Sequence, residues 1–523
     1  MAFALLMVEV GFSLSLETTK LTGNDKLTFH FSDLNKNDMK PNSILPKQTR
    51  RDFIQKGALA ASSFFIVPRH VLGKGFVAPS DKLNIAGVGV GGKGFSDVNN
   101  AYHNGANNIV ALCDIDWGRA KQNFDKHSNA ARYKDFRVMF DKEAKNIDAV
   151  TVSTADHSHA VVAMAAMQLG KHVYVQKPLT HNIYEARMLT EAARKHQVVT
   201  QMGNQGSSNP AQKTMVDWFD SGLIGKVHTV HVWTNRPVWP QGIALPTASD
   251  APSDVDWDVW IGPAQKVGYS PGYHPFKWRG WWNFGAGALG DIGCHQIDVP
   301  FRVLGLGSPT EVECSVGAVF LKDWVSEYIP DGCPPSSQVK IKFGATAKNK
   351  SDVMLHWSDG GIRPFRPDFL PEGVPLSDDG GDNGVFMIGD KGLMMCGMYG
   401  QNPQIYTSTG QLIEAPKSDR RKPATPEWGH QLLWTEACKA GFGSEAHRGL
   451  TSSFDFAGPL TESVLMGNLA IRSYNIRSSN GNGFSYPGRK RLLWDGASMK
   501  ITNFDDANQF VRRQYREGWS LGV

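Results

Sequence analysis

LNIAGVGVGGKG, residues 83–94, joins an apolar run to a cluster of glycines. The apolar run predicts a buried strand, and a helix is expected after it, over residues 95–103. The glycines have the G-x-G-x-x-G spacing, with one more before the last: Gly87, Gly89, Gly91 and Gly92. At a strand-to-helix turn, such glycines let backbone N–H groups and the helix N-terminus approach the pyrophosphate of a dinucleotide. The stretch therefore predicts the first βα unit of a dinucleotide-binding domain.

An acidic residue follows at the distance that such a domain requires. Residues 109–114 predict the second strand, and Asp114 at its end comes 22 residues after Gly92. In dinucleotide-binding domains, a carboxylate about 20 residues beyond the glycines accepts the ribose hydroxyls, and it would repel a 2′-phosphate. Asp114 therefore favours NAD over NADP, a preference that nearby Arg119 weakens. A glycine turn that binds no ligand is the alternative interpretation.

Strands and helices alternate beyond this point. The expected elements, beginning with a strand, cover residues 147–153, 159–169, 172–176, 183–196 and 198–202. This alternation predicts an α/β fold with a doubly wound parallel sheet of the Rossmann type, whose ligand binds at the carboxyl ends of the strands. Loops at those ends would line the nicotinamide half of the site. The candidate cofactor contacts there are Ser153, Thr154, His157, His159, Gln176 and Lys177.

Several short motifs in this region point to one family. The tripeptide Gln176-Lys177-Pro178 lies at a strand end and occurs together with GVGVGG (87–92), ALCDID (111–116) and TADHSHA (154–160). In these motifs the chain resembles the Gfo/Idh/MocA oxidoreductases, relatives of glucose-fructose oxidoreductase and inositol dehydrogenase. The likeness continues through the second domain and weakens toward the C-terminus. The usual tripeptide of the family is Glu-Lys-Pro, so Gln176 is a departure that removes a negative charge beside the lysine.

The resemblance implies a second motif, an Asp and a His four residues apart at the start of a helix. Asp291-Ile-Gly-Cys-His295-Gln-Ile-Asp298 matches it, and on a helix these three residues share one face. The pattern of the family implies that His295 is the general base or acid, that Lys177 is a hydrogen-bond partner and proton relay, and that Asp291 fixes a neighbouring sugar hydroxyl. Asp298 orients His295, caps structure or contacts substrate. Oxidation of an alcohol needs such a base and a cation beside the developing alkoxide.

Aromatic residues crowd the stretch between Trp257 and Trp282. Indole faces stack on the C–H faces of pyranose rings, so a carbohydrate substrate is expected. The candidate substrate residues are His274, Trp278, Arg279, Trp281 and Asp298. The alternative is an aromatic core between domains. A metal site from Asp291, His295 and His274 is conceivable, but none is expected, because the family that the chain resembles works without metal.

The rest of the chain predicts a second domain. Helices are expected at 211–219 and 456–476, and strands at 227–234, 310–319, 338–343, 353–357 and 385–388. The resemblance implies an α+β domain with a large open, mainly antiparallel sheet whose outer face pairs subunits into a homo-oligomer. We expect three parts: a leader at 1–78, an NAD-binding Rossmann domain at 79–206 and a substrate-binding and oligomerisation domain at 207–523.

Composition excludes several other classes of protein. The chain has 523 residues, of which 41% are hydrophobic and 20% charged, as in a soluble protein of two or three domains. The formal charge of +5 lies mostly in residues 1–75, since the remainder has 45 Lys and Arg against 44 Asp and Glu. This balance predicts no nucleic-acid partner. The six scattered cysteines suggest neither a zinc site nor a disulfide scaffold. No apolar stretch reaches the roughly 20 residues of a membrane span, so no stable membrane insertion is expected.

The leader contains a candidate export signal. Thr49-Arg50-Arg51-Asp52-Phe53 resembles a twin-arginine signal, and an apolar stretch follows over 57–67. The signal predicts a periplasmic protein that is exported folded, with its cofactor already inserted and tightly held. An amphipathic N-terminal helix is the alternative. Residues 1–38 fit neither a signal nor a domain, and a start codon assigned too far upstream accounts for them.

These features predict an exported NAD-dependent oxidoreductase that acts on a secondary hydroxyl of a sugar or glycoside. The alternative is an NAD-dependent glycoside hydrolase that oxidises a ring carbon, eliminates the leaving group and reduces the carbon again. His295 could serve as base in both schemes. A sugar-binding protein with a vestigial cofactor site is a third interpretation, which the presence of both Lys177 and His295 disfavours.

Overall fold

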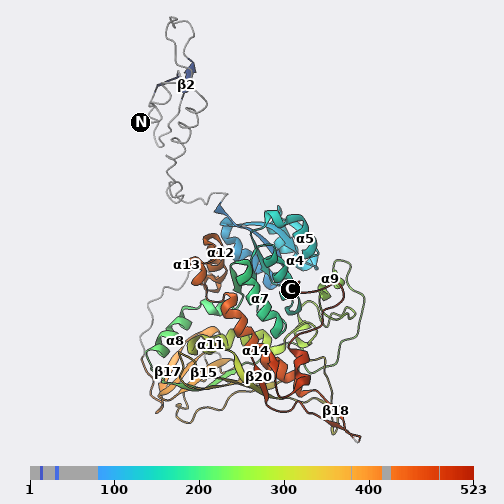
Figure 1. Cartoon of the computed structure of the whole chain (residues 1–523), viewed down its shortest axis with the longest axis vertical. Helices are drawn as coiled ribbons and strands as arrows, with labels where there is room; N and C mark the ends of the chain where they lie inside the picture. The colour runs from blue at the N-terminus through green and yellow to red at the C-terminus, as the bar shows by residue number, and fades with distance from the viewer. Residues whose placement is uncertain are drawn as a thin grey trace. The chain divides into compact units, whose positions relative to one another are not determined.

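The computed structural model describes residues 81–377, 380–414, 426–481 and 483–522, together with the backbone of two short paired strands, β1 (Phe12–Ser15) and β2 (His30–Asp33). Residues 1–76 and 77–523 form two separate compact units. The candidate export signal lies outside the described residues. Both large sheets belong to the second unit (Figure 1).

A six-stranded parallel sheet forms the first half of this unit. Its strand order is β5-β4-β3-β6-β7-β8, the order typical of a dinucleotide-binding fold. The strands are β3 (Asn84–Val88), β4 (Asn108–Cys113), β5 (Ala131–Tyr133), β6 (Ala149–Val152), β7 (His172–Val175) and β8 (Thr200–Met202). Every pairing in it is parallel. The predicted doubly wound Rossmann sheet is confirmed.

Helices connect these strands, as a parallel sheet requires. They are α3 (Lys93–Tyr102), α4 (Trp117–Lys126), α5 (Phe136–Glu143), α6 (His159–Gln168) and α7 (Ile183–His196). Helix α7 has the bounds that the sequence predicts, because both of its ends carry local signals. The Asn182 side chain caps it by accepting from the backbone N–H of Glu185 at 3.0 Å, and three basic residues occupy the last turn.

A nine-stranded sheet forms the second half. Its order is β17-β16-β15-β9-β14-β13-β10-β20-β21, and each pairing is antiparallel except that of β14 with β9. The strands are β9 (Val227–Trp233), β10 (Pro309–Val316), β13 (Ser337–Phe343), β14 (Val353–Ser358), β15 (Gly384–Gly389), β16 (Gly392–Cys396), β17 (Gln404–Thr407), β20 (Leu492–Asp495) and β21 (Lys500–Ile501). Buried side chains alternate along β13 and β14, as in a sheet with one face on the core. The predicted large, mainly antiparallel sheet is confirmed.

The remaining helices follow the last strand of the six-stranded sheet in the chain. They are α8 (Pro210–Asp220), α9 (Trp257–Ile261), α10 (Gly287–Gln296), α11 (Asp298–Leu304), α12 (His430–Ala440), α13 (Glu445–Arg448) and α14 (Phe454–Tyr474). Two small hairpins project from this half, β11 (Phe320–Lys322) with β12 (Val325–Ser326), and β18 (Ser478–Ser479) with β19 (Phe484–Ser485). Within the described ranges, no helix has both the length and the apolar character of a membrane span.

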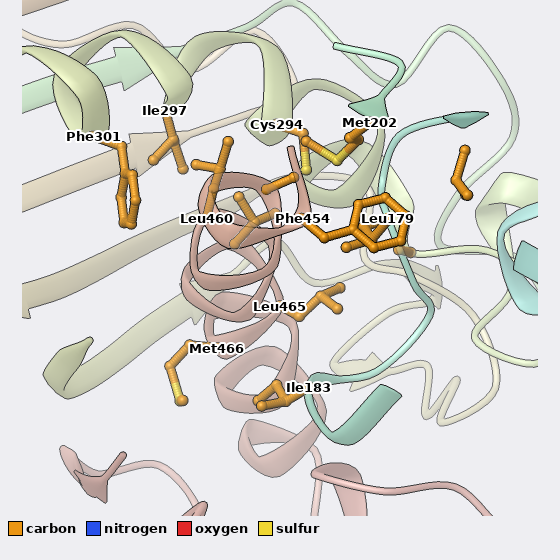
Figure 2. Packing of buried hydrophobic residues seen from close by; sticks show 14 of the residues in the cluster. Leu179, Ile183, Met202, Cys294, Ile297, Phe301, Phe454, Leu460, Leu465 and Met466 are labelled. Atoms are coloured by element: carbon orange, nitrogen blue, oxygen red, sulfur yellow. The ribbon is translucent and has the colours of Figure 1, made fainter. Parts of the chain in front are cut away.

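Helix α14 is the shared core element. It packs against α7 of the Rossmann half and against α10 and β10 of the other half, and Figure 1 shows it between the two. Figure 2 shows Leu460 and Leu465 of α14 among Ile183, Met202 and Ile297, which come from both halves. One continuous apolar core therefore fixes the two sheets relative to each other.

Replacing Leu460 with Ala should lower the free energy of unfolding by about 2–5 kcal/mol, because the truncation leaves a cavity in that shared core. Leu460 is 0% exposed. The matched control is Leu433→Ala in α12, where the side chain is 45% exposed, and we expect a change within about 0.5 kcal/mol. Urea unfolding followed by circular dichroism measures both variants. Equal losses in the two would contradict the assignment of α14 to the shared core.

Candidate active site

A cavity of about 550 Å³ lies at the carboxyl ends of strands β3, β4, β6 and β7. Side chains from the second half, most of them between residues 236 and 295, together with Tyr399 and Trp519, complete its wall. It contains most of the residues that the sequence singles out, namely Gly89, Gly91, Gly92, Asp114, Ser153, Thr154, His157, Gln176, Lys177, His274, Trp278, Arg279, Asp291 and His295. Two motifs about a hundred residues apart in the chain thus meet in one hollow.

The glycine turn forms one end of the cavity and fits a dinucleotide. Gly89 and Gly92 have φ angles of 75° and 55°, in the left-handed region that favours glycine. A Cβ atom on Gly89 would lie 2.8 Å from the backbone of Ser153, and one on Gly92 would lie 2.5 Å from the Arg119 guanidinium. Gly87 does not line the cavity. It lies against α3, where a Cβ atom would meet Val98 at 2.8 Å. The turn can pack this closely against Ser153 and Arg119 only because these positions are glycine.

Asp114 lies at the end of β4 beside this turn. Its carboxylate accepts from the backbone N–H groups of Gly91, at 2.9 Å, and Asp116, at 3.0 Å. Burial raises the pKa of Asp114, while these two N–H groups lower it. Arg119 also borders the cavity. The acid is therefore fixed beside the glycine turn at the wall of the cavity.

Lys177 and Asp291 join the two halves of the molecule inside the cavity. The Lys177 ammonium donates to Oδ1 of Asp291 at 2.7 Å and to the Asp291 carbonyl oxygen at 2.6 Å. The Arg279 Nε also donates to Oδ1, at 3.1 Å. Burial alone would raise the pKa of Asp291, but the charges of Lys177 and Arg279 outweigh it and hold that pKa well below its usual range. Asp291 is therefore ionised.

His295 lies one turn along α10 from Asp291. Its side chain is 3% exposed, and the ring contacts Tyr399 edge to face at 4.9 Å between centroids. Burial, and then the charge of Lys177, lower the pKa of His295 well below its usual value. Among the described residues, Nδ1 has no hydrogen-bond partner. The imidazole is therefore neutral and able to accept a proton.

The departure at Gln176 has a structural reason. Gln176 Nε2 donates to Oδ2 of Asp97 at 2.9 Å, and Asp97 is completely buried. The same carboxylate accepts from Ser153 Oγ at 2.8 Å and from Gln431 Nε2 at 3.0 Å. A glutamate at 176 would place a second carboxylate against this buried one, where repulsion is strong. The Gln176 amide therefore pairs with Asp97, and Lys177 makes its ion pair with Asp291 instead.

Two of the histidines at the end of β6 hold loops together. His159 does not line the cavity, and its ring nitrogens lie 2.8 Å from the Pro178 carbonyl oxygen and 3.1 Å from that of Thr154. His157 reaches the cavity wall, but its Nε2 lies 2.8 Å from the Trp260 carbonyl oxygen. Burial lowers the pKa of His157 to about 3 and that of His159 to about 4. His159 thus lies behind the cavity wall, and its role as a cofactor contact stays a prediction.

Three of the predicted substrate residues lie elsewhere than expected. Trp281 is 1% exposed and packs in an aromatic core, so the alternative interpretation holds for this tryptophan. Asp298 is buried behind the wall, where it accepts from Arg302 at 2.9 Å. His274 lines the cavity, but its Nε2 lies 2.8 Å from Oδ2 of Asp116, at the Asp114 end. Neither Trp281 nor Asp298 forms part of the cavity wall.

Arg279 and Trp278 form an aromatic corner of the cavity that sequence reasoning found only in part. The Arg279 guanidinium lies 4.2 Å from the ring centroid of Trp278, 4.7 Å from that of Phe276 and 5.8 Å from that of Trp239. These stacking contacts, with the hydrogen bond to Asp291, fix the guanidinium. Trp239 and Phe276 were missed because they lie in a Pro/Gly-rich stretch without periodicity.

Two further residues of the cavity were also missed. Asp156 is 4% exposed, and its Oδ2 accepts from the backbone N–H of Ala286 at 3.1 Å. Burial raises the pKa of Asp156 to about 7, although the charges of Arg279 and Lys177 lower it. Tyr399 borders the cavity in a left-handed conformation with φ 62°. Asp156 stands within the TADHSHA motif and could have been found there, whereas no sequence signal marks Tyr399.

Comparison with known proteins gives two matching family regions. Residues 83–204 match the Gfo/Idh/MocA family region described as "Oxidoreductase family, NAD-binding Rossmann fold". Residues 212–323 match the region described as "Oxidoreductase family, C-terminal alpha/beta domain".

Curated relatives match part of the chain. Inositol 2-dehydrogenase of Salmonella typhimurium is 30% identical over 125 residues, which cover 24% of this chain and 37% of that protein. Levoglucosan dehydrogenase of Pseudarthrobacter phenanthrenivorans is 25% identical over 234 residues, covering 44% and 50%. Glycosyl hydrolase family 109 protein 1 of a Shewanella species is 26% identical over 183 residues, covering 32% and 39%. The chain thus spans half or less of the length of these relatives. The two matched regions adjoin in the chain, and residues of both line the cavity, so residues 83–204 and 212–323 are similar to the two domains of the Gfo/Idh/MocA oxidoreductases.

Proposed function

We propose that this protein is an NAD-dependent oxidoreductase that oxidises a secondary hydroxyl of a sugar or glycoside and holds its cofactor tightly. One observation carries the proposal. Lys177, from the end of β7, and His295, from α10, line the same cavity as the glycine turn and Asp114. A cofactor ring, an alcohol and a proton acceptor can therefore meet in one hollow.

The cofactor site would be built from the glycine turn and the ends of the strands. The backbone at Gly89, Gly91 and Gly92 would hold the pyrophosphate, and Asp114 would accept the ribose hydroxyls. When bound, NAD accepts a hydride from the alcohol carbon or returns it. A carboxylate at 114 disfavours the 2′-phosphate of NADP by repulsion.

The chain itself moves the hydroxyl proton. His295 is the proposed base, because its imidazole lines the same cavity as Lys177 and its Nδ1 has no hydrogen-bond partner among the described residues. The Lys177 ammonium has three N–H donors, of which two bind Asp291. The third is left for the substrate oxygen, where it would stabilise the negative charge that develops on oxidation. Asp291 thus orients the ammonium.

Chemistry at the rim supports a carbohydrate as substrate. The indoles of Trp239 and Trp278 line the cavity, and the guanidinium of Arg279, which stacks on both rings, is a fixed donor there. Such faces stack on sugar rings while the donors bind hydroxyls. The names of the relatives support this substrate class, since inositol and levoglucosan both carry ring hydroxyls.

Adding sugars and inositols to the purified protein should produce reduced cofactor, seen by its absorbance while still bound. In Lys177→Ala, the rate should fall by about 10²–10⁴-fold, because the donor that stabilises the alkoxide is lost. NAD should remain bound, since the glycine turn is untouched. The matched control is Lys121→Ala, whose side chain is 70% exposed on α4, and it should keep the full rate. Full activity in Lys177→Ala would refute the assignment.

The alternative function is redox-neutral cleavage of a glycoside. The match to glycosyl hydrolase family 109 protein 1 favours it. After transient oxidation of a ring carbon, His295 could remove the acidified neighbouring proton and the leaving group would depart. A water molecule would then add to the resulting double bond, and the hydride would return to the oxidised carbon. Release of an aglycone from aryl glycosides without lasting cofactor reduction would support this scheme. Lasting reduction without cleavage would support the dehydrogenase.

Asp156 should make the stability of the protein depend on pH. In the native state the carboxyl keeps its proton up to about pH 7, whereas in an unfolded chain it ionises near pH 4. Between these values the native state binds more protons than the unfolded state, so the contribution of Asp156 falls as pH rises. Asp156→Asn cannot ionise. The melting temperature of this variant minus that of wild type should rise from about pH 5 to pH 7 and then level off. A difference that does not change with pH would contradict the raised pKa of Asp156.

Export and assembly complete the proposal. The resemblance to a twin-arginine signal at Arg50 and Arg51 supports transport of the folded protein to the periplasm. The subunits would pair through the nine-stranded sheet. Light scattering on the purified protein measures whether it forms an oligomer. Changing both arginines to lysine should abolish periplasmic accumulation in a bacterial host that has the pathway. Cell fractionation measures it, and unchanged accumulation of the double variant would refute this route.

A further inference from the structure

A segment distant in sequence reaches the proposed cofactor cavity. Residues 511–522, here called the return segment, lie beyond the nine-stranded sheet in the chain and run back to the Rossmann half. The backbone N–H of Tyr184 in α7 donates to the Val511 carbonyl oxygen at 3.0 Å. Gln168 at the end of α6 donates to the Gly522 carbonyl oxygen at 2.7 Å. Between these two points, Trp519 forms part of the cavity wall.

The neighbours of Trp519 place it at the Asp114 end of the cavity. Its ring centroid lies 6.0 Å from that of Phe136, which begins α5 directly after β5 and also lines the cavity. Strand β5 pairs with β4, and the backbone N–H of Asp114 donates to the Tyr133 carbonyl oxygen at 3.0 Å. In this fold the carboxylate at the end of the second strand marks the adenosine ribose. Trp519 therefore borders the space where the adenine would lie.

Charged contacts hold this indole in place. The Arg137 guanidinium lies 4.3 Å from the ring centroid of Trp519. Arg516 bonds to Asp258 at 2.5 Å and to the Gly262 carbonyl oxygen at 2.9 Å, which ties the return segment to α9. Arg513 makes an ion pair with completely buried Glu185 at 2.9 Å. The wall is thus fixed before a ligand arrives.

Helix α9 covers the same end of the cavity from another direction. The backbone N–H of Asp256, which caps α9, donates to the Ile115 carbonyl oxygen at 3.0 Å, one residue beyond Asp114. Trp260 of α9 lines the cavity as well. Two segments from outside the Rossmann half therefore enclose the adenosine end, and Arg516 joins them.

We propose that the return segment builds the adenine subsite of this protein, with Trp519 as its stacking wall, and that retention of the cofactor depends on it. The inference rests on the proposed function, because it takes the ligand of the cavity to be NAD. An adenine ring presents a flat π face that stacks on an indole, and such stacking is independent of hydrogen-bond recognition. The subsite should therefore recognise any adenine nucleotide that reaches Asp114.

The test is titration of the nucleotide-free full chain with NAD, ADP-ribose and nicotinamide mononucleotide. Trp519→Ala should weaken NAD and ADP-ribose about tenfold or more, and should leave nicotinamide mononucleotide unchanged. Trp519→Phe keeps a ring and should restore most of the affinity. The matched control is Trp324→Ala, whose side chain is 97% exposed on the β11–β12 hairpin, and its affinities should equal those of wild type. Circular dichroism confirms that each variant is folded.

The outcomes separate the two proposals. Unchanged ADP-ribose affinity in folded Trp519→Ala, with binding by wild type, would refute the subsite and leave the proposed function intact. An equal loss for nicotinamide mononucleotide would also refute it, because that outcome signals a general distortion of the cavity. Wild-type protein that binds neither NAD nor ADP-ribose would refute the proposed function together with this inference.

Discussion

The ion pair between Lys177 and Asp291 is the constraint on which the site depends. It joins a loop of the six-stranded sheet to helix α10, and each side chain is only 14% exposed. Separating the two side chains of such a pair would be destabilising, since each would then be a buried charge without a partner. The two halves must therefore dock in one way, and the continuous core around α14 fixes that docking. Apolar packing far from the chemistry thus decides where the ammonium and the imidazole lie.

Local signals account for what sequence could predict. The glycine turn, the acid at the end of β4 and the helix at 183–196 each depend on residues close in the chain. The two motifs that contain Lys177 and His295 were found because a resemblance linked them. Long-range placement was not accessible: Trp278 and Trp281 lie three residues apart and pack in the same aromatic core, yet only Trp278 also lines the cavity.

Chain position also hid several members of the wall. Tyr399 follows β16, a strand that the sequence did not predict, and nothing periodic surrounds it. His274 has the residue type of a substrate ligand, but its loop crosses to Asp116 at the cofactor end. Gln176 shows the opposite case, in which an apparent defect in a motif is explained by a partner far away in sequence. The Gln176 amide donates a hydrogen bond to the buried Asp97, which no local sequence pattern identifies as its partner.

The return segment has a consequence for the order of assembly. Residues 511–522 leave the ribosome after every strand of both sheets, so the enclosure around the adenosine end is completed late in synthesis. A nascent chain can form its glycine turn early, yet it gains the Trp519 wall only when both sheets already exist. Nucleotide capture would then report that the whole fold has formed, and a chain that stalled earlier would lack a closed site.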